Sequence, residues 1–332
     1  MIHTENLTRS FRVGHETVEA VRGIDLDVGA GELVAFLGPN GAGKSTTLRM
    51  LTSLLPPTSG RAVVAGVDVA EDPAGVRRRI GYIGQKDGAG HNYRVRDELV
   101  MQGRFHGMGK AESLDAAEEL LRTLDLESLG LRKVSTLSGG QKRRLDIALG
   151  LIHSPRLLFL DEPSTGMDPQ NRANLWEHIL RVREQHGTTI VLTTHYLDEA
   201  DAMAERVVII DHGRVIADDT AGRLKAEQAG DRLTVTVAPE HVAVATSVLA
   251  GASVPVAAGA VPEPDTSPPE VDERPAPDGV ALTVGVTGAA HVVPGLLGRL
   301  RDTGVDVRAV ESRRPTLDDV FLNLTGRSLR EA

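Results

Sequence analysis

The residues most able to do chemistry form a glycine-rich loop near the N-terminus. Residues 38–45 match the pattern G-x-x-x-x-G-K-[ST], directly after an apolar run at 32–37 and directly before a helical run at 46–52. Glycines let successive backbone N–H groups point at a phosphate, and the start of the helix adds partial positive charge. Lys44 is placed to reach outer phosphates, and Ser45 to hold Mg²⁺. The candidate nucleotide-binding residues of this loop are Gly38, Pro39, Asn40, Gly41, Ala42, Gly43, Lys44, Ser45 and Thr46.

Two carboxylates follow an apolar run at residues 157–160. Ligands bind at the carboxyl ends of parallel strands, so Asp161 is placed to coordinate Mg²⁺ and Glu162 to orient or deprotonate an attacking water. Two acids alone would equally well cap a strand. Beside a phosphate loop, the hydrolytic interpretation is favoured.

A third motif is Leu-Ser-Gly-Gly-Gln at residues 137–141. Ser138 and Gln141 have the spacing of a capping box, and Gly139 and Gly140 between them leave backbone N–H groups open to an anion. The motif therefore predicts a second helix start that binds phosphate.

In order and spacing, these motifs resemble the ATP-binding subunits of ABC transporters, whose signature is LSGGQ. The resemblance implies ATP and Mg²⁺ as cofactors and roles for four further residues. Gln85 corresponds to the Q-loop glutamine that contacts the metal, Asp168 to the D-loop aspartate, and His195 to the switch histidine that touches the γ-phosphate. Phe11 stands where the family usually has a tyrosine that stacks on adenine. Met167 replaces a common leucine.

The resemblance gives each candidate residue a role. The catalytic residues are Lys44, Gln85, Glu162 and His195, and the metal ligands are Ser45, Gln85 and Asp161. In this family two subunits stack head to tail, so that each ATP lies between Lys44 of one chain and residues 138–141 of the other. A homodimer and a separate multi-span membrane permease are the partners that the resemblance implies.

The elements that must position these residues indicate an α/β fold with a largely parallel sheet. Strands are expected at residues 32–37, 79–83, 157–160, 189–193 and 206–211. Leucines and alanines fall at helical spacing in 115–124 and 141–152. We expect a P-loop NTPase domain of the ABC type at residues 1–226, with a helical subdomain at about 86–152.

A second domain is expected at residues 231–326, with alternating strands at 233–237 and 280–286, a helix opened by Pro239, an apolar run at 253–257, and a helix and strand at 289–302 and 305–310. This order predicts a small α+β ferredoxin-like domain with a regulatory or dimerising role. Seven of the 17 prolines fall between residues 254 and 279, together with six acids, so a disordered proline-rich loop is expected at about 259–279.

The tail carries an amphipathic pattern. Thr316 and Asp319 have capping-box spacing, and the following helix places one apolar face at Leu317, Val320, Phe321 and Leu324. That face packs either within its own domain or across a dimer of ATPase chains.

Three stretches, at residues 194–201, 211–217 and 317–326, resemble the daunorubicin-resistance type of drug-export ATPase. Export of a drug or hydrophobic antibiotic is therefore the expected function. An importer or a lipid or polysaccharide exporter would share every catalytic residue, and a soluble ABC remodelling factor is a further alternative. Six lysines are far outnumbered by arginines, a bias associated with GC-rich bacterial genomes.

Composition excludes several classes of function. The 332 residues are 41% hydrophobic, which suits a globular chain, and contain no cysteine, so no disulfide or thiolate chemistry is expected. No apolar run approaches the roughly 20 residues that cross a bilayer, and no signal peptide is evident. A net charge of −9 argues against nucleic-acid binding, and residues 77–79 read as a solvated basic face. The expected location is the cytoplasmic face of a bacterial membrane.

Overall fold

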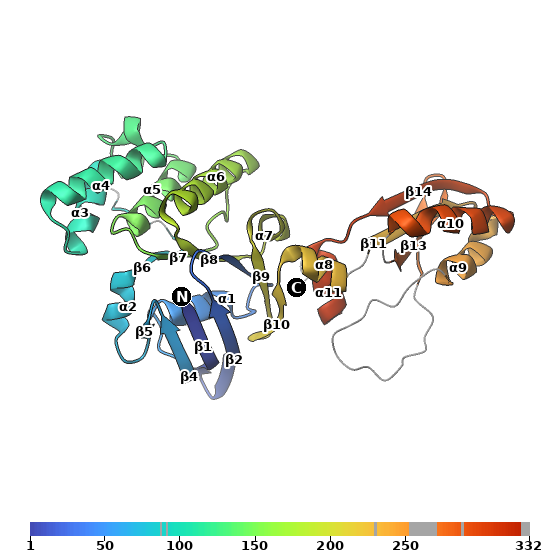
Figure 1. Ribbon diagram of the computed structural model, residues 1–332, viewed down its shortest axis with the longest axis horizontal. Helices are drawn as coiled ribbons and strands as arrows, with labels where there is room; N and C mark the ends of the chain where they lie inside the picture. The colour runs from blue at the N-terminus through green and yellow to red at the C-terminus, as the bar shows by residue number, and fades with distance from the viewer. Residues whose placement is uncertain (87, 91, 229–230, 252–270, 287–288, 327–332) are drawn as a thin grey trace. The chain divides into compact units, whose positions relative to one another are not determined.

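The computed structural model describes residues 1–86, 88–90, 92–228, 231–251, 271–286 and 289–326. The chain divides into two compact units, Met1–Asp218 and Asp219–Ala332 (Figure 1). This division differs from the expected boundary at residue 226, because helix α8 (Ala221–Gln228) packs against α11 (Leu317–Thr325) of the second unit. None of the helices formed by the described residues combines the length and the apolar character needed to cross a bilayer.

A six-stranded sheet in the order β10-β9-β3-β8-β7-β6 is central to the first unit. Its strands are β3 (Leu33–Leu37), β6 (Ile80–Ile83), β7 (Leu157–Asp161), β8 (Thr189–Thr194), β9 (Arg206–Asp211) and β10 (Arg214–Asp219). The pairs β6–β7, β7–β8, β8–β3 and β3–β9 are parallel, as predicted. Strands β3, β7 and β8 are buried along their whole length, which explains the apolar runs that each contains.

A second, antiparallel sheet in the order β2-β1-β4-β5 was not anticipated. Its strands are β1 (Ile2–Val13), β2 (Glu16–Val28), β4 (Ser59–Val64) and β5 (Val67–Asp68). Helix α1 (Lys44–Leu51) contacts strands of both sheets, and its Leu48 and Leu51 join one buried core with Phe36 of β3 and Phe159 of β7. The start of α1 is thereby held rigidly beside the central sheet.

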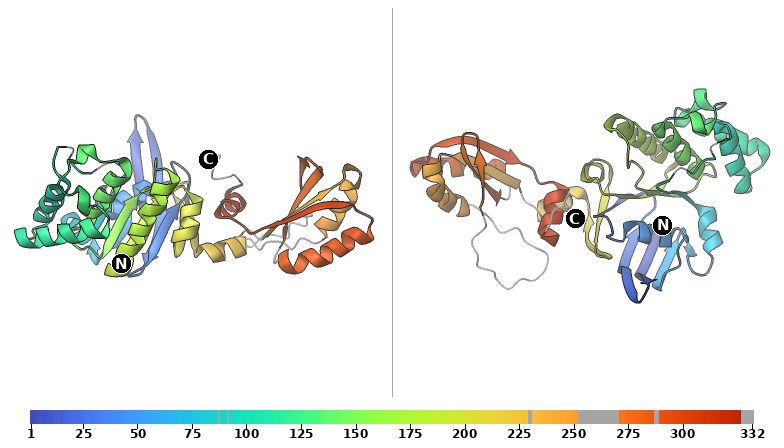
Figure 2. Two further views of the ribbon diagram at one scale, coloured as in Figure 1. Left: turned by 90° about the horizontal axis from the view of Figure 1, so that it is seen from above. Right: turned by 180° about the vertical axis from the view of Figure 1, so that it is seen from behind.

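The remaining helices of the first unit lie mainly on the opposite side of the central sheet from the antiparallel sheet (Figures 1 and 2). The larger ones are α3 (Val95–Phe105), α4 (Lys110–Thr123), α5 (Gly139–Leu151) and α6 (Pro169–His186). Helices α4 and α5 contain most of the two predicted helical stretches, whereas α3 was not predicted. Two short helices, α2 (Pro73–Arg79) and α7 (Leu197–Met203), also belong to this unit.

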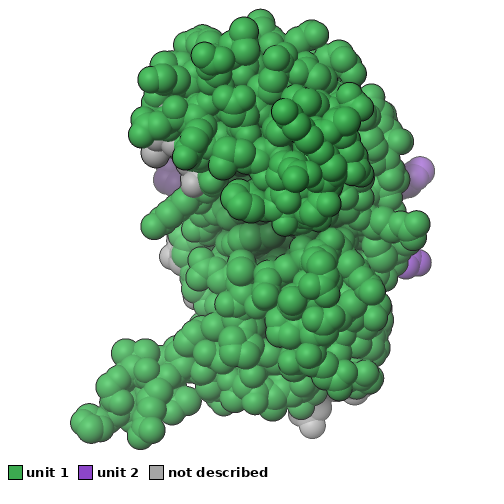
Figure 3. Space-filling model, turned by 90° about the vertical axis from the view of Figure 1, so that its left-hand side faces the viewer, with its two compact units in different colours: residues 1–218 green, residues 219–332 purple. Residues whose placement is uncertain are grey.

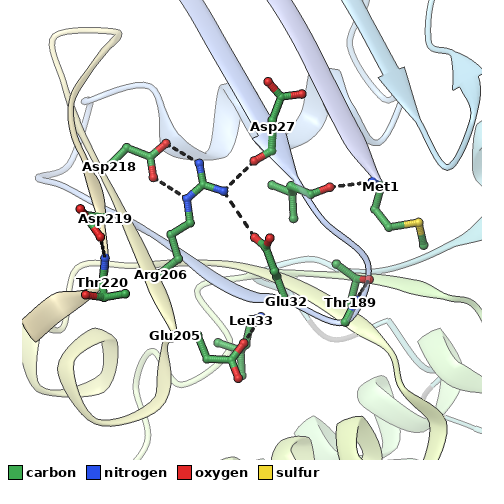
Figure 4. Close-up of polar contacts among 12 residues, drawn as sticks. Met1, Asp27, Glu32, Leu33, Thr189, Glu205, Arg206, Asp218, Asp219 and Thr220 are labelled. Atoms are coloured by element: carbon green, nitrogen blue, oxygen red, sulfur yellow. Dashed lines mark hydrogen bonds and ion pairs between the residues drawn. The ribbon is translucent and has the colours of Figure 1, made fainter. Parts of the chain in front are cut away.

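Arg206 fixes the last hairpin of the first unit to its neighbours. Its Nε and Nη2 donate to the two carboxylate oxygens of Asp218 over 2.6 and 2.7 Å, and Nη1 donates to the backbone oxygen of Asp27 over 2.7 Å (Figure 4). Glu32 accepts a longer bond of 3.4 Å from the same nitrogen. Bidentate pairing of this kind gives geometric specificity, so strands β9, β10 and β2 are held in one arrangement.

The second unit contains a four-stranded antiparallel sheet in the order β12-β13-β11-β14. Its strands are β11 (Asp231–Val237), β12 (Asp272–Ala276), β13 (Gly279–Val286) and β14 (Val307–Arg313), and its helices include α9 (Val242–Ala250) and α10 (Ala289–Asp302). Alternate residues of β11 pack with Leu249 of α9 and with Leu296 and Leu300 of α10. Strand order and helix placement fit a split βαβ arrangement, and the ferredoxin-like assignment stays a prediction.

The predicted proline-rich loop at 259–279 is wrong in its last part, because Asp272–Ala276 forms β12 and Gly279 begins β13. Strand β12 lies at the edge of the sheet, where a proline such as Pro275 is tolerated since only one side of the strand pairs. The apolar run at 253–257 lies outside the described residues.

The apolar face of α11 is covered within the same unit. Leu317, Val320 and Phe321 are buried, and α11 packs against α8. The capping box is present, with Thr316 accepting from the Asp319 N–H and Asp319 accepting from the Thr316 N–H. Arg313 and Arg232 donate to the same buried carboxylate at 3.0 and 3.1 Å, which ties the start of α11 to β14 and β11. Of the two alternatives for this face, the structure favours packing within the unit.

Replacing Phe321 with alanine should therefore destabilise the second unit. A fully buried phenylalanine leaves a cavity when truncated, and we expect a loss of about 3 kcal/mol in the free energy of unfolding. Chemical denaturation measures this loss, and Val244→Ala at an exposed position of α9 is the matched control. Weaker self-association with unchanged stability would instead place this face in a contact between two chains.

Candidate active site

The glycine-rich loop runs from the end of β3 to the start of α1, as the sequence predicted. Gly43 has φ 106°, a left-handed conformation that disfavours other residues, and a Cβ there would lie 2.6 Å from the backbone oxygen of Ala20. A Cβ on Gly38 would lie 2.1 Å from the backbone oxygen of Ile210. Both glycines are thus required by close backbone approaches, and the loop is fixed between β2 and β9.

Lys44 is the first residue of α1 and is only 4% exposed. Its Nζ donates to the backbone oxygens of Gly38 over 2.7 Å and Pro39 over 2.9 Å, so the ammonium group lies within the curl of the loop. Burial lowers the pKa of Lys44, while the carboxylates of Glu162 and Asp161 act in the opposite direction. The loop thus holds a desolvated cation that an incoming phosphate would stabilise.

The three candidate metal ligands come together at the end of β7. Ser45 Oγ donates to Asp161 Oδ1 over 2.8 Å, and Gln85 Nε2 lies 3.5 Å from Ser45 Oγ. Asp161 is fully buried, and its Oδ2 has no hydrogen-bond partner among the described residues. A hydroxyl, an amide and a buried carboxylate oxygen form the hard oxygen set that Mg²⁺ prefers, so these residues fit the ion.

Glu162 follows Asp161 in an unusual conformation, with φ 48°. Its N–H donates to the backbone oxygen of Thr193, and its Oε2 accepts from Thr165 Oγ1 over 3.2 Å. His195 Nδ1 lies 3.5 Å from Glu162 Oε1, and the ring of Tyr196 packs 4.2 Å from the histidine ring. The predicted base and the predicted switch histidine are therefore neighbours.

The signature motif forms the helix start that the sequence predicted. Ser138 is the N-cap of α5, its Oγ accepts from the Gln141 N–H over 3.3 Å, and Gln141 Oε1 accepts from the Ser138 N–H over 3.0 Å. Ser138, Gly139 and Gly140 line a cavity of about 280 Å³. The same cavity is lined by Gln85, Arg143, Glu162, Pro163, Thr165, Gly166, Met167, Asp168 and Asn171.

Asp168 has a structural role beside its predicted one. It is the N-cap of α6, where its Oδ1 accepts from the Asn171 N–H over 2.9 Å. This bond, followed by one from the Asn171 side chain, lowers the pKa of the Asp168 carboxyl. Phe11 is part of strand β1 in the antiparallel sheet, and the guanidinium of Arg9 is 4.7 Å from the centre of its ring.

Two residues that sequence reasoning did not place in the site also contact it. Arg143 donates to the backbone oxygens of Gly84 over 2.7 Å and Pro163 over 2.8 Å, which joins α5 to the segments before Gln85 and after Glu162. Thr193 Oγ1 donates to Asp161 Oδ1 over 2.8 Å. The signal available for Thr193 was its position near the carboxyl end of a strand next to β7.

Together, a phosphate-binding loop at a strand end, an adjacent acid pair, a neighbouring histidine and a capped signature helix define an ATPase of the ABC class. A family model described as "ABC transporter" matches residues 21–165. The chain belongs to the family of ABC transporter ATP-binding subunits.

Curated relatives and solved structures agree with this assignment. The daunorubicin resistance ATP-binding protein DrrA3 of Streptomyces coeruleorubidus is 41% identical over 95% of this chain and 94% of that protein. The linearmycin resistance ATP-binding protein LnrL of Bacillus subtilis is 32% identical over the whole of both chains. Among solved structures, a dimer of the ATP-binding cassette MJ0796 bound to ADP and Pi has a TM-score of 0.61 and 26% identity, and covers 66% of this chain and 98% of that one.

Proposed function

We propose that this chain is the subunit that hydrolyses ATP to power a separate multi-span membrane protein, which exports a drug or hydrophobic antibiotic. The observation that carries the proposal is the extent of similarity to drug-resistance ATP-binding proteins, which are 38–43% identical over 92–95% of the chain. Because this similarity includes the second unit, it reaches beyond the catalytic residues that all ABC ATPases share.

The site residues have different roles in ATP hydrolysis. Lys44 and the loop N–H groups bind the outer phosphates, and Mg²⁺ bound by Ser45, Gln85 and Asp161 would neutralise phosphate charge. Glu162 orients a water and accepts its proton as the oxygen attacks the γ-phosphorus and the bond to ADP breaks. His195 contacts the γ-phosphate from beside Glu162.

In this proposal a second copy of the chain contributes to each ATP site, so the active form is a homodimer. Within the described residues the chain has one G-x-x-x-x-G-K-[ST] loop and one signature helix start. Gly139 and Gly140 are the first residues of α5, and their N–H groups can bind the γ-phosphate of an ATP held by a second chain. Two chains arranged head to tail would then share two ATP molecules.

A groove along strand β6, at the edge of the central sheet, supports a membrane partner. The groove has a volume of about 280 Å³ and is lined by residues of β6 with Arg77, Gln102, His106 and His153. The surface on this side of the first unit is visibly hollowed (Figure 3). Gly84 and Lys86 line the groove, whereas Gln85 between them lines the cavity with Glu162, so one loop connects both.

The chemistry of the groove fits a helix with an apolar face. The rings of His106 and His153 stack at 3.7 Å, and burial, with a smaller contribution from His106, lowers the pKa of His153 to about 4, so His153 adds no charge to the groove at neutral pH. Arg77, Lys86 and Asp146 also line the groove and can contact the polar side of such a helix. Helix α3, which contributes to the groove, also presents Phe105, 79% exposed. A multi-span partner bound here would place the chain at the cytoplasmic face of the bacterial membrane.

One relative keeps a second candidate cargo in view. A Nod factor export ATP-binding protein I of Paraburkholderia xenovorans is 36% identical over 99% of this chain and 98% of that protein. Export of a lipid or polysaccharide, which the shared catalytic residues also allow, is the alternative.

Reconstitution tests the proposal directly. The chain is co-expressed with a multi-span membrane protein encoded beside its gene, and uptake of a fluorescent anthracycline into inside-out vesicles is measured with ATP. We expect uptake only when both proteins are present, and none with ADP. ATP-dependent uptake of a lipid-linked compound without anthracycline uptake would favour the alternative cargo.

A further inference from the structure

A single buried hydroxyl connects the two acidic residues of the site. Thr193 lies near the end of β8, between β3 and β7, and is fully buried. Its Oγ1 donates to Asp161 Oδ1 over 2.8 Å and accepts from the Glu162 N–H over 2.9 Å. One side chain thus contacts both the candidate metal ligand and the candidate base.

The first of these bonds sets the orientation of the Asp161 carboxylate. Oδ1 accepts from Thr193 and also from Ser45, each over 2.8 Å, while Oδ2 is buried without a hydrogen-bond partner among the described residues. Two hydroxyl donors on one oxygen fix the rotation of the carboxylate. The second oxygen keeps its lone pairs available for a cation.

The second bond supports a strained backbone. Glu162 has φ 48°, which is uncommon for a residue other than glycine, asparagine or aspartate. Its N–H is held by both the backbone oxygen and the hydroxyl of Thr193, at 3.2 and 2.9 Å. Strain of this kind persists where neighbouring groups enforce it, and here it brings the Glu162 carboxylate to Thr165 and His195.

We propose that Thr193 is a positioning residue for ATP hydrolysis, whose hydroxyl orients Asp161 toward Mg²⁺ and holds the backbone of Glu162 in its working conformation. The proposal rests on the ATPase activity argued above. The role needs one group that donates and accepts at once, which serine can supply and alanine and valine cannot.

Strand β8 offers a matched control. Thr189 is also a threonine, 1% exposed, four residues earlier and therefore on the same face of the strand. Its hydroxyl accepts from the Gly31 N–H over 2.8 Å, away from both acidic residues. Thr189→Val removes one buried hydroxyl from the same strand without touching the site.

The experiment compares Thr193→Ser with Thr193→Ala in the full-length chain. Both variants lose the same methyl group and differ only in the hydroxyl, so their cost in packing is shared. Thr193→Val and Thr189→Val form a second pair that keeps side-chain volume. For each variant we measure the ATPase rate, the affinity for a fluorescent ATP analogue with Mg²⁺ and with EDTA, and the unfolding temperature.

We expect Thr193→Ala and Thr193→Val to lose turnover by on the order of tenfold or more, because a hydrogen bond to a charged group is removed. The gain in nucleotide affinity that Mg²⁺ produces should shrink in both, while affinity in EDTA stays within about twofold of the parent, since Lys44 and the loop are untouched. Thr193→Ser and Thr189→Val should keep both the rate and the Mg²⁺ effect.

Three results would overturn the proposal: equal behaviour of Thr193→Ser and Thr193→Ala, an unchanged Mg²⁺ effect in Thr193→Val, or an equal loss in Thr189→Val. If either valine variant fails to fold, the serine and alanine pair decides alone. A parent chain that hydrolyses no ATP would instead count against the ATPase function on which this proposal rests.

Discussion

Lys44→Ala is expected to abolish ATP binding at concentrations that saturate the parent. The Lys44 ammonium is 4% exposed and lies inside the loop, bonded to the backbone oxygens of Gly38 and Pro39. Burial has already removed most of the hydration of this ammonium group. When ATP binds, charged phosphate oxygens replace the two neutral backbone acceptors, and charge-assisted hydrogen bonds are about twice as strong as neutral ones. Without this cation, the repulsion between the triphosphate and the carboxylates of Asp161 and Glu162 would not be compensated.

Binding of a fluorescent ATP analogue measures this effect, and Lys110→Ala at an exposed position of α4 is the control for loss of a lysine charge. Unfolding without nucleotide shows whether the variant retains its fold. A folded Lys44→Ala chain that binds ATP with the affinity of the parent would contradict the assignment of this loop.

The parts of the site that could be predicted are those formed by residues close in the sequence. The bend at Gly43 and the capping box of Ser138 and Gln141 each depend on residues within one turn, so residue type and spacing determine them. The parallel sheet was predictable because β3, β7 and β8 are buried along both faces and each contains an apolar run.

The parts that could not be predicted depend on pairing between distant residues. Thr193 reaches Asp161 across 32 positions, and Arg143 reaches Gly84 across 59. The parallel register that pairs Asp161 with Thr193 creates the first contact, and nothing near Thr193 in the sequence marks that register. Strand β12 was missed for a related reason, because its acids and Pro275 read as a loop, whereas an edge strand needs a partner on only one side.

The second large effect is expected from Glu162→Gln. The variant chain should bind ATP at least as well as the parent but hydrolyse it on the order of 10³-fold more slowly, a loss within the range that a positioned base contributes. Glutamine keeps the size of the side chain and can still accept from Thr165 Oγ1, so the local geometry is retained. It cannot accept a proton from water at neutral pH. Loss of one negative charge beside the phosphates also reduces repulsion, which favours retention of ATP.

Because the γ-phosphate is proposed to join two chains, Glu162→Gln should also accumulate as a dimer with ATP. Sedimentation with ATP and with ADP measures this, and Glu184→Gln at an exposed position of α6 is the control for a lost glutamate charge. Adding Ser138→Arg to Glu162→Gln should return the protein to monomer, since a bulky cation would occupy the start of α5. A Glu162→Gln chain that hydrolyses at the parental rate would mean that another group orients the water. A Glu162→Gln chain that retains ATP as a monomer would mean that the start of α5 does not take part in an ATP site shared by two chains.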